Sequence, residues 1–470
     1  MLENLTAHTQ GMEAYSMFDS FQSRVAAARG SNQLFFAALI PAKRIASIFG
    51  DASAILDSAR VYTTAVTVWT LLAQVLSSDH GCVSAVAKLI AFRASNDQSI
   101  PSSKTGAYCI ARDKLDEDAM QRTLCQTGDA IEEAAPDQWL WVGHRVIVGD
   151  GTTVTMPDTP ANQKEYPQLT AQKKGCGFPL MRIVVLFAIS TGVVLQMATG
   201  QYKGKLTAEI SLFRTIDEIV KETDVFLADR AYSAWFDIAR LSKRGAHTVL
   251  RKHQMRKTDF RKGKRLGKDD HIESWPKPDR PEWMTVEEYA TYPDSIEVRE
   301  VRVRIETYGF RTKEVFVVTD LLDPAQYSKA DLAALFRRRW QAELNLRSLK
   351  TVMQMEHLRC KEPHRVRNEI RAHMIGYNLI RQLMCEVAIK GNVQPWQISF
   401  KSTMQTLNEM LPILSAIEDH ARLCETMLDC CLKHVVGNRP DRFEPRVVKR
   451  RQKPYKLMTK PRDQYKPEES

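Results

Sequence analysis

Residues 139–156 read WLWVGHRVIVGDGTTVTM, and residues 181–200 read MRIVVLFAISTGVVLQMATG. Both stretches are rich in β-branched and other apolar residues, a composition that is typical of strands. The pair Thr191-Gly192 divides the second stretch into two apolar runs, as a hairpin turn would. The two stretches therefore predict three strands that follow one another as a meander.

Helices and strands are predicted to alternate in the residues that follow the meander. A helix is expected over residues 206–220, a short buried strand in DVFLADRAY (224–232), a helix over 234–243 and a strand in HTVLRK (247–252). This order is typical of a mixed sheet with helices on both faces. The predicted fold class is therefore α/β, with an RNase H-like core.

A β-rich stretch and further helices surround this core. The alternating runs IEVREVRVRIE (296–306) and KEVFVVTDL (313–321) predict two strands, and residues 331–355 predict a long helix. The chain before residue 139 is mostly helical in pattern, and two helices near 364–390 and 402–435 precede a Lys- and Pro-rich tail. The predicted division is a helical region at 1–138, the first part of the core at 139–252, a β-rich insertion at 253–322, the second part of the core at 323–362, a helical region at 363–437 and a basic tail at 438–470.

The composition is that of a globular protein with a negatively charged partner. A length of 470 residues and a mass of 53.6 kDa suggest two or three domains. Hydrophobic residues at 44% and charged residues at 26% exclude wholesale disorder and a fibrous repeat. Lys and Arg number 67 against 56 Asp and Glu, for a net charge of +11. Such a surplus is typical of proteins that bind nucleic acid or an anionic membrane surface.

Two features argue against a membrane partner. The most apolar stretch, residues 183–198, is interrupted by polar residues and is shorter than the roughly 18 residues that a spanning helix needs. The first ten residues, MLENLTAHTQ, have neither the basic nor the apolar region of a secretory signal.

The nine cysteines form no C-x-x-C pair, which predicts reduced thiols. We therefore expect a cytoplasmic protein without membrane association.

The positive charge is concentrated in two segments. Residues 251–268 (RKHQMRKTDFRKGKRLGK) hold nine Lys or Arg and one acid, and residues 439–470 hold eleven Lys or Arg and five acids. Two basic segments predict two contact surfaces for a phosphate backbone. The alternative is a solvated loop and a disordered tail. The candidate phosphate contacts in the first segment are Lys252, Arg256, Lys257, Arg261 and Lys262.

Three acids stand where a ligand can be held. Asp150 follows the predicted strand RVIVG, and Asp229 follows the predicted strand VFLA. Side chains at such strand ends project into a crevice at the sheet edge. Small neighbours, among them Gly149 and Gly151, leave room for a ligand. The third acid is Glu343, inside the long predicted helix.

Helical geometry places Glu343 beside two cations. At 100° per residue, one arc of about 60° holds Phe336, Arg339, Glu343 and Lys350. This arc borders an apolar stripe that would dock on the sheet, so Glu343 is well placed to face an active site. The alternative is an ordinary i,i+4 ion pair between Arg339 and Glu343.

Three converging carboxylates would require a cation. They repel one another unless a hard divalent cation lies between them. With two Mg²⁺ ions about 3.5–4 Å apart, one activates a water or a 3′-hydroxyl and the other stabilises the leaving oxygen of a phosphodiester. Such chemistry needs no covalent enzyme nucleophile, and the sequence has no G-x-S-x-G, P-loop or G-x-G-x-x-G motif.

Three blocks of the sequence carry a family resemblance. They are GDGTTVTMPDTPANQ (149–163), LADRAY (227–232) and FRRRWQAELNLRSLK (336–350). These blocks resemble the catalytic blocks of bacterial DDE transposases of insertion-sequence family four. The signature of that family is Tyr, two residues, Arg, three residues, Glu, six residues and Lys. This sequence matches it at Arg339, Glu343 and Lys350 but has Phe336 in the place of the tyrosine.

The resemblance covers roughly residues 30–435 and implies a site and a reaction. Asp150, Asp229 and Glu343 would be the catalytic residues and the ligands of two Mg²⁺ ions, for which Mn²⁺ would substitute. Arg339 and Lys350 would hold DNA phosphate. The resemblance also implies an RNase H-like core with the β-rich insertion between the second Asp and the Glu.

The same resemblance implies partners. They are double-stranded DNA, both as terminal inverted repeats and as target, and a second copy of the chain in a homodimer on DNA. A helical N-terminal region would bind DNA, and the reaction would be cut-and-paste transposition. The expected location is the bacterial cytoplasm, in association with the nucleoid.

Several further residues are weaker candidates. Arg338 and Arg230 are candidate DNA contacts, and Arg230 is equally placed to pair with Asp229. Asn162 either orients a ligand or forms a turn. Two tryptophans beside the basic segment either stack on bases or pack within the β-rich stretch, namely Trp275 and Trp283.

Three functions are compatible with these residues. An active, metal-dependent DNA transposase is preferred, because all three acids are present. The first alternative is a DNA-binding protein that descends from a transposase and has lost catalysis. The second is an RNase H-like nuclease that cuts DNA without joining it, since hydrolysis and strand transfer share one site.

Overall fold

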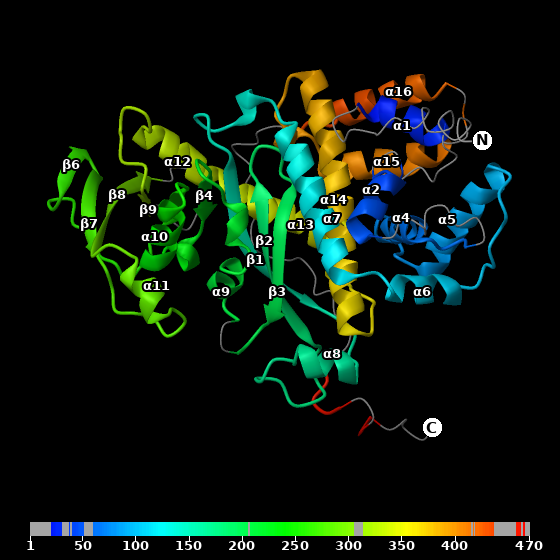
Figure 1. Ribbon diagram of the computed structural model, residues 1–470, viewed down its shortest axis with the longest axis horizontal. Coiled ribbons are helices and arrows are strands. Elements are labelled where there is room, and N and C mark those ends of the chain that lie inside the picture. The colour runs from blue at the N-terminus through cyan, green and yellow to red at the C-terminus, as the bar shows by residue number, and fades with distance from the viewer. Residues whose placement is uncertain are drawn as a thin grey trace, which may run out of the picture. The chain divides into compact units, whose positions relative to one another are not determined.

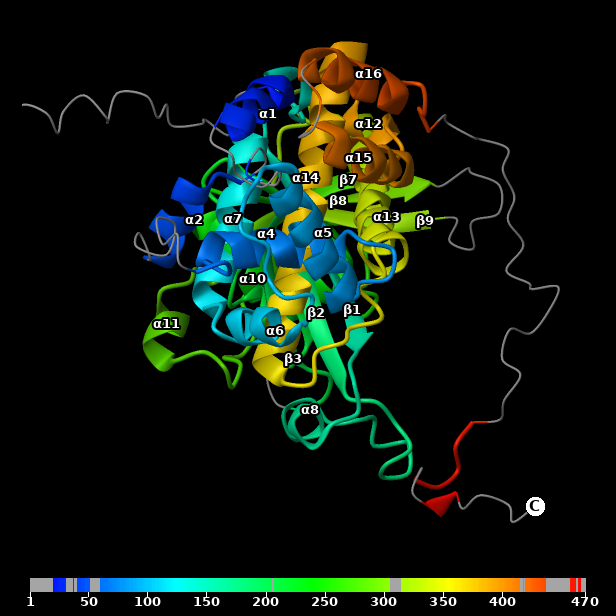
Figure 2. The ribbon, with the colours of Figure 1, turned by 90° about the vertical axis from the view of Figure 1, so that its right-hand side faces the viewer.

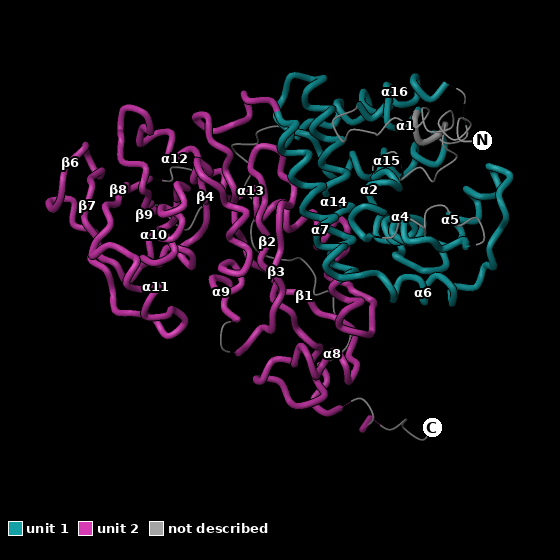
Figure 3. The backbone as a smooth tube through the Cα atoms, viewed as in Figure 1, with its two compact units in different colours: residues 1–135, 368–436 teal, residues 136–367, 437–470 magenta. Residues whose placement is uncertain are grey.

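A computed structural model describes residues 20–30, 37, 40–50, 60–204, 207–304, 314–414, 417, 419–436, 457–461 and 464–465. The chain divides into two compact units (Figure 3). The first consists of residues 1–135 and 368–436, and the second of residues 136–367 and 437–470. The first unit is helical, and the second contains a large sheet. Most of the predicted basic tail lies outside the described residues.

The helical unit combines helices from both ends of the chain. Ion pairs join them: Arg24 Nη2 lies 2.7 Å from Glu386 Oε1, and Arg371 Nη1 lies 2.9 Å from Glu117 Oε2. Helices that are far apart in the sequence therefore share one core. The helices are α1 (Phe21–Gly30), α2 (Ala42–Phe49), α4 (Thr64–Val75), α5 (Cys82–Ser95), α6 (Gly106–Asp113), α7 (Glu117–Glu133), most of α14 (Pro363–Gly391), α15 (Phe400–Leu414) and α16 (His420–Leu432).

Local sequence explains where several of these helices begin. Thr63 Oγ1 accepts a hydrogen bond from the Val66 amide at the start of α4, and Asp116 Oδ1 accepts one from the Ala119 amide at the start of α7. The predicted helix at 402–435 is instead two helices, α15 and α16. No helix in the described ranges is both long enough and apolar enough to cross a membrane.

A mixed sheet of nine described strands forms the second unit (Figures 1 and 2). The strand order is β3-β2-β1-β4-β5-β9-β8-β7-β6. β1, β2 and β3 pair antiparallel, β4 and β5 run parallel to β1, and the remaining pairs are antiparallel. The strands are β1 (Val146–Thr155), β2 (Leu180–Ala188), β3 (Val194–Gln201), β4 (Val225–Ala228), β5 (His247–Arg251), β6 (Lys264–Gly267), β7 (Asp270–Pro276), β8 (Ser295–Arg304) and β9 (Glu314–Thr319).

The predicted α/β class is confirmed. The three-stranded meander and the alternation that follows it are both present, with α10 (Trp235–Lys243) between β4 and β5. The helix predicted over 206–220 is shorter, because only α9 (Glu209–Phe213) is α-helical and a 3-10 turn follows at Asp217–Ile219. The middle of β2 is completely buried, as its apolar sequence requires.

The β-rich stretch continues the central sheet and is not a separate body. β9 pairs with β5, with Leu250 opposite Val318, and β8, β7 and β6 follow outward. β8 and β9 confirm the two strands predicted here, whereas β6 and β7 arise where no strand was predicted. Arg299 in β8 is fully buried, and its guanidinium donates to both carboxylate oxygens of Asp270, at 2.8 and 2.6 Å. Backbone pairing between β9 and β5 holds the extension to the core, and the buried ion pair joins β8 to β7 within the extension.

The long predicted helix at 331–355 is broken. It consists of α12 (Lys329–Arg338), α13 (Trp340–Arg347) and a π-helical turn at Ser348–Val352, with the break at Arg339. α12 packs against β5, and α13 packs against β1. The break therefore falls at the point where the segment passes from one strand of the sheet to another (Figure 1).

Candidate active site

A pocket of about 470 Å³ lies in the sheet-containing unit. It brings together the three predicted acids, Asp150 from β1, Asp229 from the turn after β4 and Glu343 from α13, although these residues are far apart in the sequence. Both predicted cations of the helix also line it. The lining residues are Asp150, Gly151, Asp229, Arg339, Glu343, Leu346, Arg347, Lys350, Thr351 and Glu356.

Asp150 lies in the middle of β1, not at the end of a strand as predicted. Its Oδ1 accepts a hydrogen bond from the Gly151 amide at 2.9 Å. Burial raises the pKa of Asp150 to about 6; the hydrogen bond from Gly151 and the positive charge of Arg339 oppose this shift, and the negative charges of Glu343 and Glu209 add to it. A bound cation would stabilise the ionised form of this buried carboxyl group, so Asp150 is suited to binding a cation.

The two glycines beside Asp150 make room for neighbouring side chains, and Gly151 also lines the pocket, whereas Gly149 does not. A Cβ on Gly149 would lie 2.9 Å from the ring of Phe226. A Cβ on Gly151 would overlap the carboxyl group of Glu209. The sequence Gly-Asp-Gly thus lets an aromatic ring and a further acid approach β1 on either side of Asp150.

Asp229 directly precedes the 3-10 turn at Arg230–Tyr232 that follows β4. Its Oδ1 lies 3.6 Å from Nη1 of Arg251 and is buried without a hydrogen-bond partner among the described residues. The adjacent Arg230 does not pair with Asp229. Arg230 is exposed, and its Nη1 donates to Oε1 of Gln254 at 2.7 Å. The cation at Asp229 therefore comes from the end of β5, a residue to which no role was assigned from the sequence.

Three residues of the predicted helical signature line the pocket and the fourth, Phe336, does not. Arg339 Nη2 lies 2.9 Å from Glu343 Oε1, so the i,i+4 ion pair forms within the pocket wall. Lys350 Nζ donates to Thr152 Oγ1 at 3.3 Å and to the Thr153 carbonyl at 3.1 Å, which ties the π-helical turn to β1. Phe336 is 8% exposed and does not line the pocket.

The donor chemistry of the pocket fits a hard divalent cation. Four carboxylates line one small volume, since Glu356 joins the three predicted acids. Asp150 is buried enough to have a raised pKa, and Asp229 has an orphaned oxygen. The oxygens of the three predicted acids are not all within 4.8 Å of one another, since among the described residues only His271, Glu273 and Glu300 meet that condition. Ligation of one ion by all three acids would therefore require them to move closer together.

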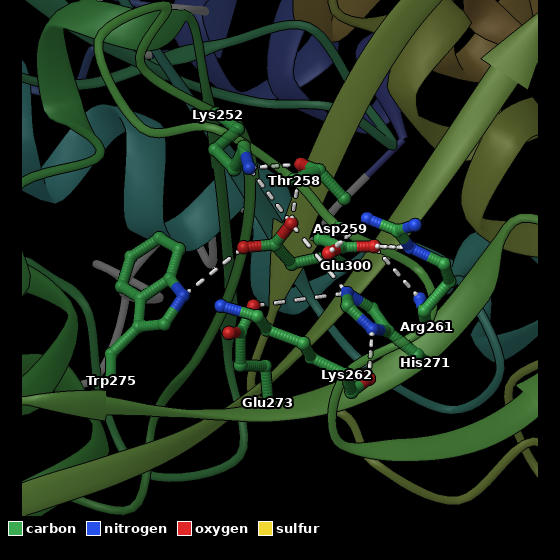
Figure 4. Close-up of polar contacts among 9 residues, drawn as sticks. All are labelled: Lys252, Thr258, Asp259, Arg261, Lys262, His271, Glu273, Trp275 and Glu300. Atoms are coloured by element: carbon green, nitrogen blue, oxygen red, sulfur yellow. Dashed lines mark hydrogen bonds and ion pairs between the residues drawn. The ribbon is translucent and has the colours of Figure 1, made fainter.

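The cluster of His271, Glu273 and Glu300 is a buried charge network (Figure 4). Glu300 accepts hydrogen bonds from Lys252 Nζ at 2.8 Å, from Thr258 Oγ1 at 2.6 Å and from Trp275 Nε1 at 3.1 Å. His271 Nε2 lies 3.7 Å from Glu300 and 4.0 Å from Glu273. Because Lys252 already balances Glu300, this cluster is less open to a cation than the pocket.

This network corrects the prediction for Lys252. The side chain is 3% exposed and bound to Glu300, so its charge is not presented to a phosphate backbone. Trp275 is 4% exposed, which leaves no face for a base, and Arg256 stacks over its ring at 4.1 Å. Trp283 packs too, with Arg214 3.8 Å from its ring centroid. Packing, one of the two predicted alternatives, thus accounts for both tryptophans.

Two further candidates also have internal partners. Arg338 is largely buried, which lowers its pKa, and its Nη2 donates to the Ile189 carbonyl at 3.2 Å. Asn162 is fully buried, and its Nδ2 donates to the carbonyls of Pro157 and Cys360 at 3.0 and 3.3 Å. Neither residue lines the pocket, so the structure assigns both to internal packing.

The remaining basic candidates are exposed except Arg256, which is half-buried against Trp275. Arg261 is 89% exposed and pairs with Asp259 at 2.9 Å, and Lys257 and Lys262 are exposed as well.

Two residues near the pocket, Glu209 and Tyr232, were not predicted from the sequence. Nothing in the spacing of α9 or of the turn after β4 indicates which strand these residues meet.

Comparisons with known proteins find a family model, a relative and a solved structure that resemble this chain. A family model described as "Transposase DDE domain" matches residues 141–379, which include all three acids. The chain is 26% identical over 372 residues to "Transposase InsG for insertion sequence element IS4" of Escherichia coli (strain K12), which covers 77% of this chain and 80% of that protein. A solved piggyBac transposase synaptic complex with hairpin DNA covers 87% of both chains, with a TM-score of 0.42 and 11% identity.

Proposed function

The chain belongs to the transposase DDE domain family and is a DNA transposase, and on this premise we propose that it cuts transposon ends and joins the freed 3′-hydroxyl to target DNA. The observation that carries the proposal is the single pocket that gathers Asp150, Asp229 and Glu343 with Arg339 and Lys350. Such a set is suited to phosphodiester chemistry without a covalent enzyme intermediate.

In this proposal the three acids hold two Mg²⁺ ions, with Mn²⁺ as a substitute. When bound, such ions activate a water or a 3′-hydroxyl and neutralise charge on the leaving oxygen. Arg339 fixes the carboxylate of Glu343 through their 2.9 Å ion pair. Lys350 lies at the pocket wall with its ammonium group anchored to β1, where it would meet a DNA phosphate.

The finer features of the fold and partners belong to the same proposal. The order β3-β2-β1-β4-β5, with β4 and β5 parallel to β1, supports an RNase H-like core. Exposed Lys257 and Lys262 support contact with the DNA backbone. Terminal inverted repeats and target DNA as substrates, a homodimer on DNA and an association with the bacterial nucleoid remain predictions.

A cleavage and joining assay tests the proposal. Wild type and three near-isosteric variants, Asp150→Asn, Asp229→Asn and Glu343→Gln, are incubated with intact and pre-cut element ends in Mg²⁺ or Mn²⁺. Asp279→Asn is the matched control, because Asp279 is exposed and lies outside the pocket. We expect all three variants to lose cutting and joining together and the control to keep both.

Each other outcome has a definite meaning. A variant that still cuts at the wild-type rate would remove that acid from the site. Cutting of intact ends without joining of pre-cut ends would identify a nuclease. Binding of end DNA without metal-dependent cutting would identify a catalytically inactive DNA-binding protein.

A further inference from the structure

We propose that Glu209, which borders the pocket beside Gly151, is a further carboxylate of the metal site and that the hydroxyl group of Tyr232 positions it. The inference rests on the proposed function and extends it to two residues outside the three-acid set. Glu209 is the first residue of α9, and Tyr232 ends the turn that begins at Asp229.

The first observation is the contact between Glu209 and β1. Its carboxyl carbon and both carboxyl oxygens lie where the Cβ of any other residue at position 151 would be. Gly151 follows Asp150 directly and lines the pocket. A glycine at position 151 lets this acid from another element come close to the backbone beside Asp150 without displacing its carboxyl group. The negative charge of Glu209 is near enough to raise the pKa of Asp150.

The second observation is that α9 is held in place by packing. Gly200 on β3 leaves room for Leu212, since a Cβ there would lie 2.9 Å from a methyl carbon of Leu212. The ring of Phe213 stacks on that of Phe226 in β4, with ring centroids 4.4 Å apart. Leu212 and Phe213 are both buried. The carboxyl group of Glu209 is therefore delivered to β1 by a fixed element.

The third observation is a buried hydroxyl group among the acids. Tyr232 is 2% exposed, and its hydroxyl has no hydrogen-bond partner among the described residues. Its ring packs edge-on against the stacked rings of Phe213 and Phe226, with centroids at 5.5 and 5.8 Å. Burial raises the pKa of Tyr232 well above its usual value, and the negative charges of Glu209, Asp150 and Asp229 add to the effect. The phenol is thus a protonated, unsatisfied donor within the electrostatic influence of these carboxylates.

Among Asp150, Asp229, Glu343 and Glu209, the charge balance leaves two acids for a cation. Glu343 is paired with Arg339, and Asp229 lies 3.6 Å from Arg251. In the described part of the chain, neither Asp150 nor Glu209 has a basic side chain at ion-pair distance. Two neighbouring carboxylates without a counter-ion are the arrangement that a divalent cation stabilises. The donor O–H of Tyr232 would then orient Glu209 as a ligand in the way that outer partners of metal ligands do.

Metal binding measured without DNA provides the test. Mn²⁺ affinity is determined by calorimetry and by electron paramagnetic resonance for wild type, Glu209→Gln, Tyr232→Phe and Asp150→Asn. Glu218→Gln is the matched control, since Glu218 is an exposed acid that follows α9 in the same connection between β3 and β4. The full-length chain is used throughout, and circular dichroism checks that each variant is folded.

We expect Glu209→Gln to weaken Mn²⁺ binding by about 10-fold or more, and Tyr232→Phe to weaken it by a smaller factor. The Mn²⁺ concentration needed for half-maximal cutting of end DNA should rise in parallel. Phe keeps the packing of the Tyr232 ring, so a loss of affinity in Tyr232→Phe reports the hydroxyl group alone. Glu218→Gln should match wild type in both measurements.

The inference and the proposed function fail differently. Wild-type Mn²⁺ affinity in folded Glu209→Gln, together with lost affinity in Asp150→Asn, would overturn the role of Glu209 and leave the three-acid site intact. Wild-type affinity in Tyr232→Phe alone would overturn the positioning role of the hydroxyl. Failure of the wild-type protein to bind Mn²⁺ at all would overturn both proposals.

Discussion

At the scale of single residues, the buried carboxyl group of Asp150 reduces the stability of the fold when it is ionised. Burial raises its pKa to about 6 from an ordinary value of 3.8. The folded protein therefore holds this proton more tightly than the unfolded chain does. Stability must fall as the pH rises from about 4 to about 6, and it stays reduced above that window in the absence of a cation.

The first prediction follows from this shift. With divalent metal removed by a chelator, Asp150→Asn should increase the free energy of unfolding at pH 8 by on the order of 1–3 kcal/mol, because the amide carries no charge to desolvate. The gain should disappear at pH 4, where Asp150 is protonated. Urea titrations at both pH values measure it, with Asp279→Asn as the exposed control. Equal stability of variant and wild type at pH 8 would contradict it.

Phe336 provides a second prediction at this scale. It occupies the place of the signature tyrosine, yet it is 8% exposed and does not line the pocket. Phe336→Tyr would bury a hydroxyl group at a position that is 8% exposed and should lower the free energy of unfolding by about 1–3 kcal/mol. Affinity for element ends should not change. Thermal unfolding and end binding measured on the same preparation check both parts, and tighter DNA binding would show that the tyrosine position contacts DNA.

At the scale of elements, β8 and β9 fuse the β-rich stretch to the core. Lys252 follows β5, and Glu300 lies in β8, so their ion pair bridges across β9, which lies between these strands. The side chains of Lys252 and Glu300 are both buried, since each is at most 3% exposed. An ion pair in such a place is costly to break from one side, because the remaining charge stays buried.

We predict that Lys252→Met destabilises the protein by about 3–5 kcal/mol. Lys257→Met is the matched control, because Lys257 belongs to the same basic segment but is exposed, and it should change stability by no more than about 0.5 kcal/mol. Chemical unfolding of both variants measures the difference. Similar stabilities would mean that Lys252 and Glu300 do not form a buried pair.

At the scale of the whole molecule, the basic surplus is the property that governs DNA binding. Burial removes Lys252 from the set of free cations, whereas Lys257, Arg261 and Lys262 are exposed. Charges of this kind bind phosphate without regard to base sequence and release counter-ions as they do so.

The fourth prediction concerns this surface. Lys257→Gln combined with Lys262→Gln should weaken binding to all DNA sequences alike and should lower the slope of log affinity against log salt by up to about 2. Preference for element ends over random DNA should be unchanged. Fluorescence titrations over a range of salt concentrations measure both quantities. An unchanged slope would place the DNA elsewhere, and a loss of preference would assign sequence recognition to these lysines.

The sequence by itself determined the local features of this protein. Strand-like composition predicted the meander of β1, β2 and β3, and helical spacing placed Arg339, Glu343 and Lys350 along one segment, where all three do line the pocket. Such features follow from backbone geometry over a few residues, so they can be recognised in the linear order of side chains.

Only the tertiary structure decided which distant segments meet. It placed Asp150 in mid-strand, brought Glu209 over Gly151, paired Asp229 with Arg251 and extended the sheet through β9. Each of these contacts depends on strand register and on the packing of helices against strands, which are set by interactions between residues far apart in the sequence. The same reason explains why Lys252 looked like a phosphate ligand in the sequence and is a buried partner of Glu300 in the fold.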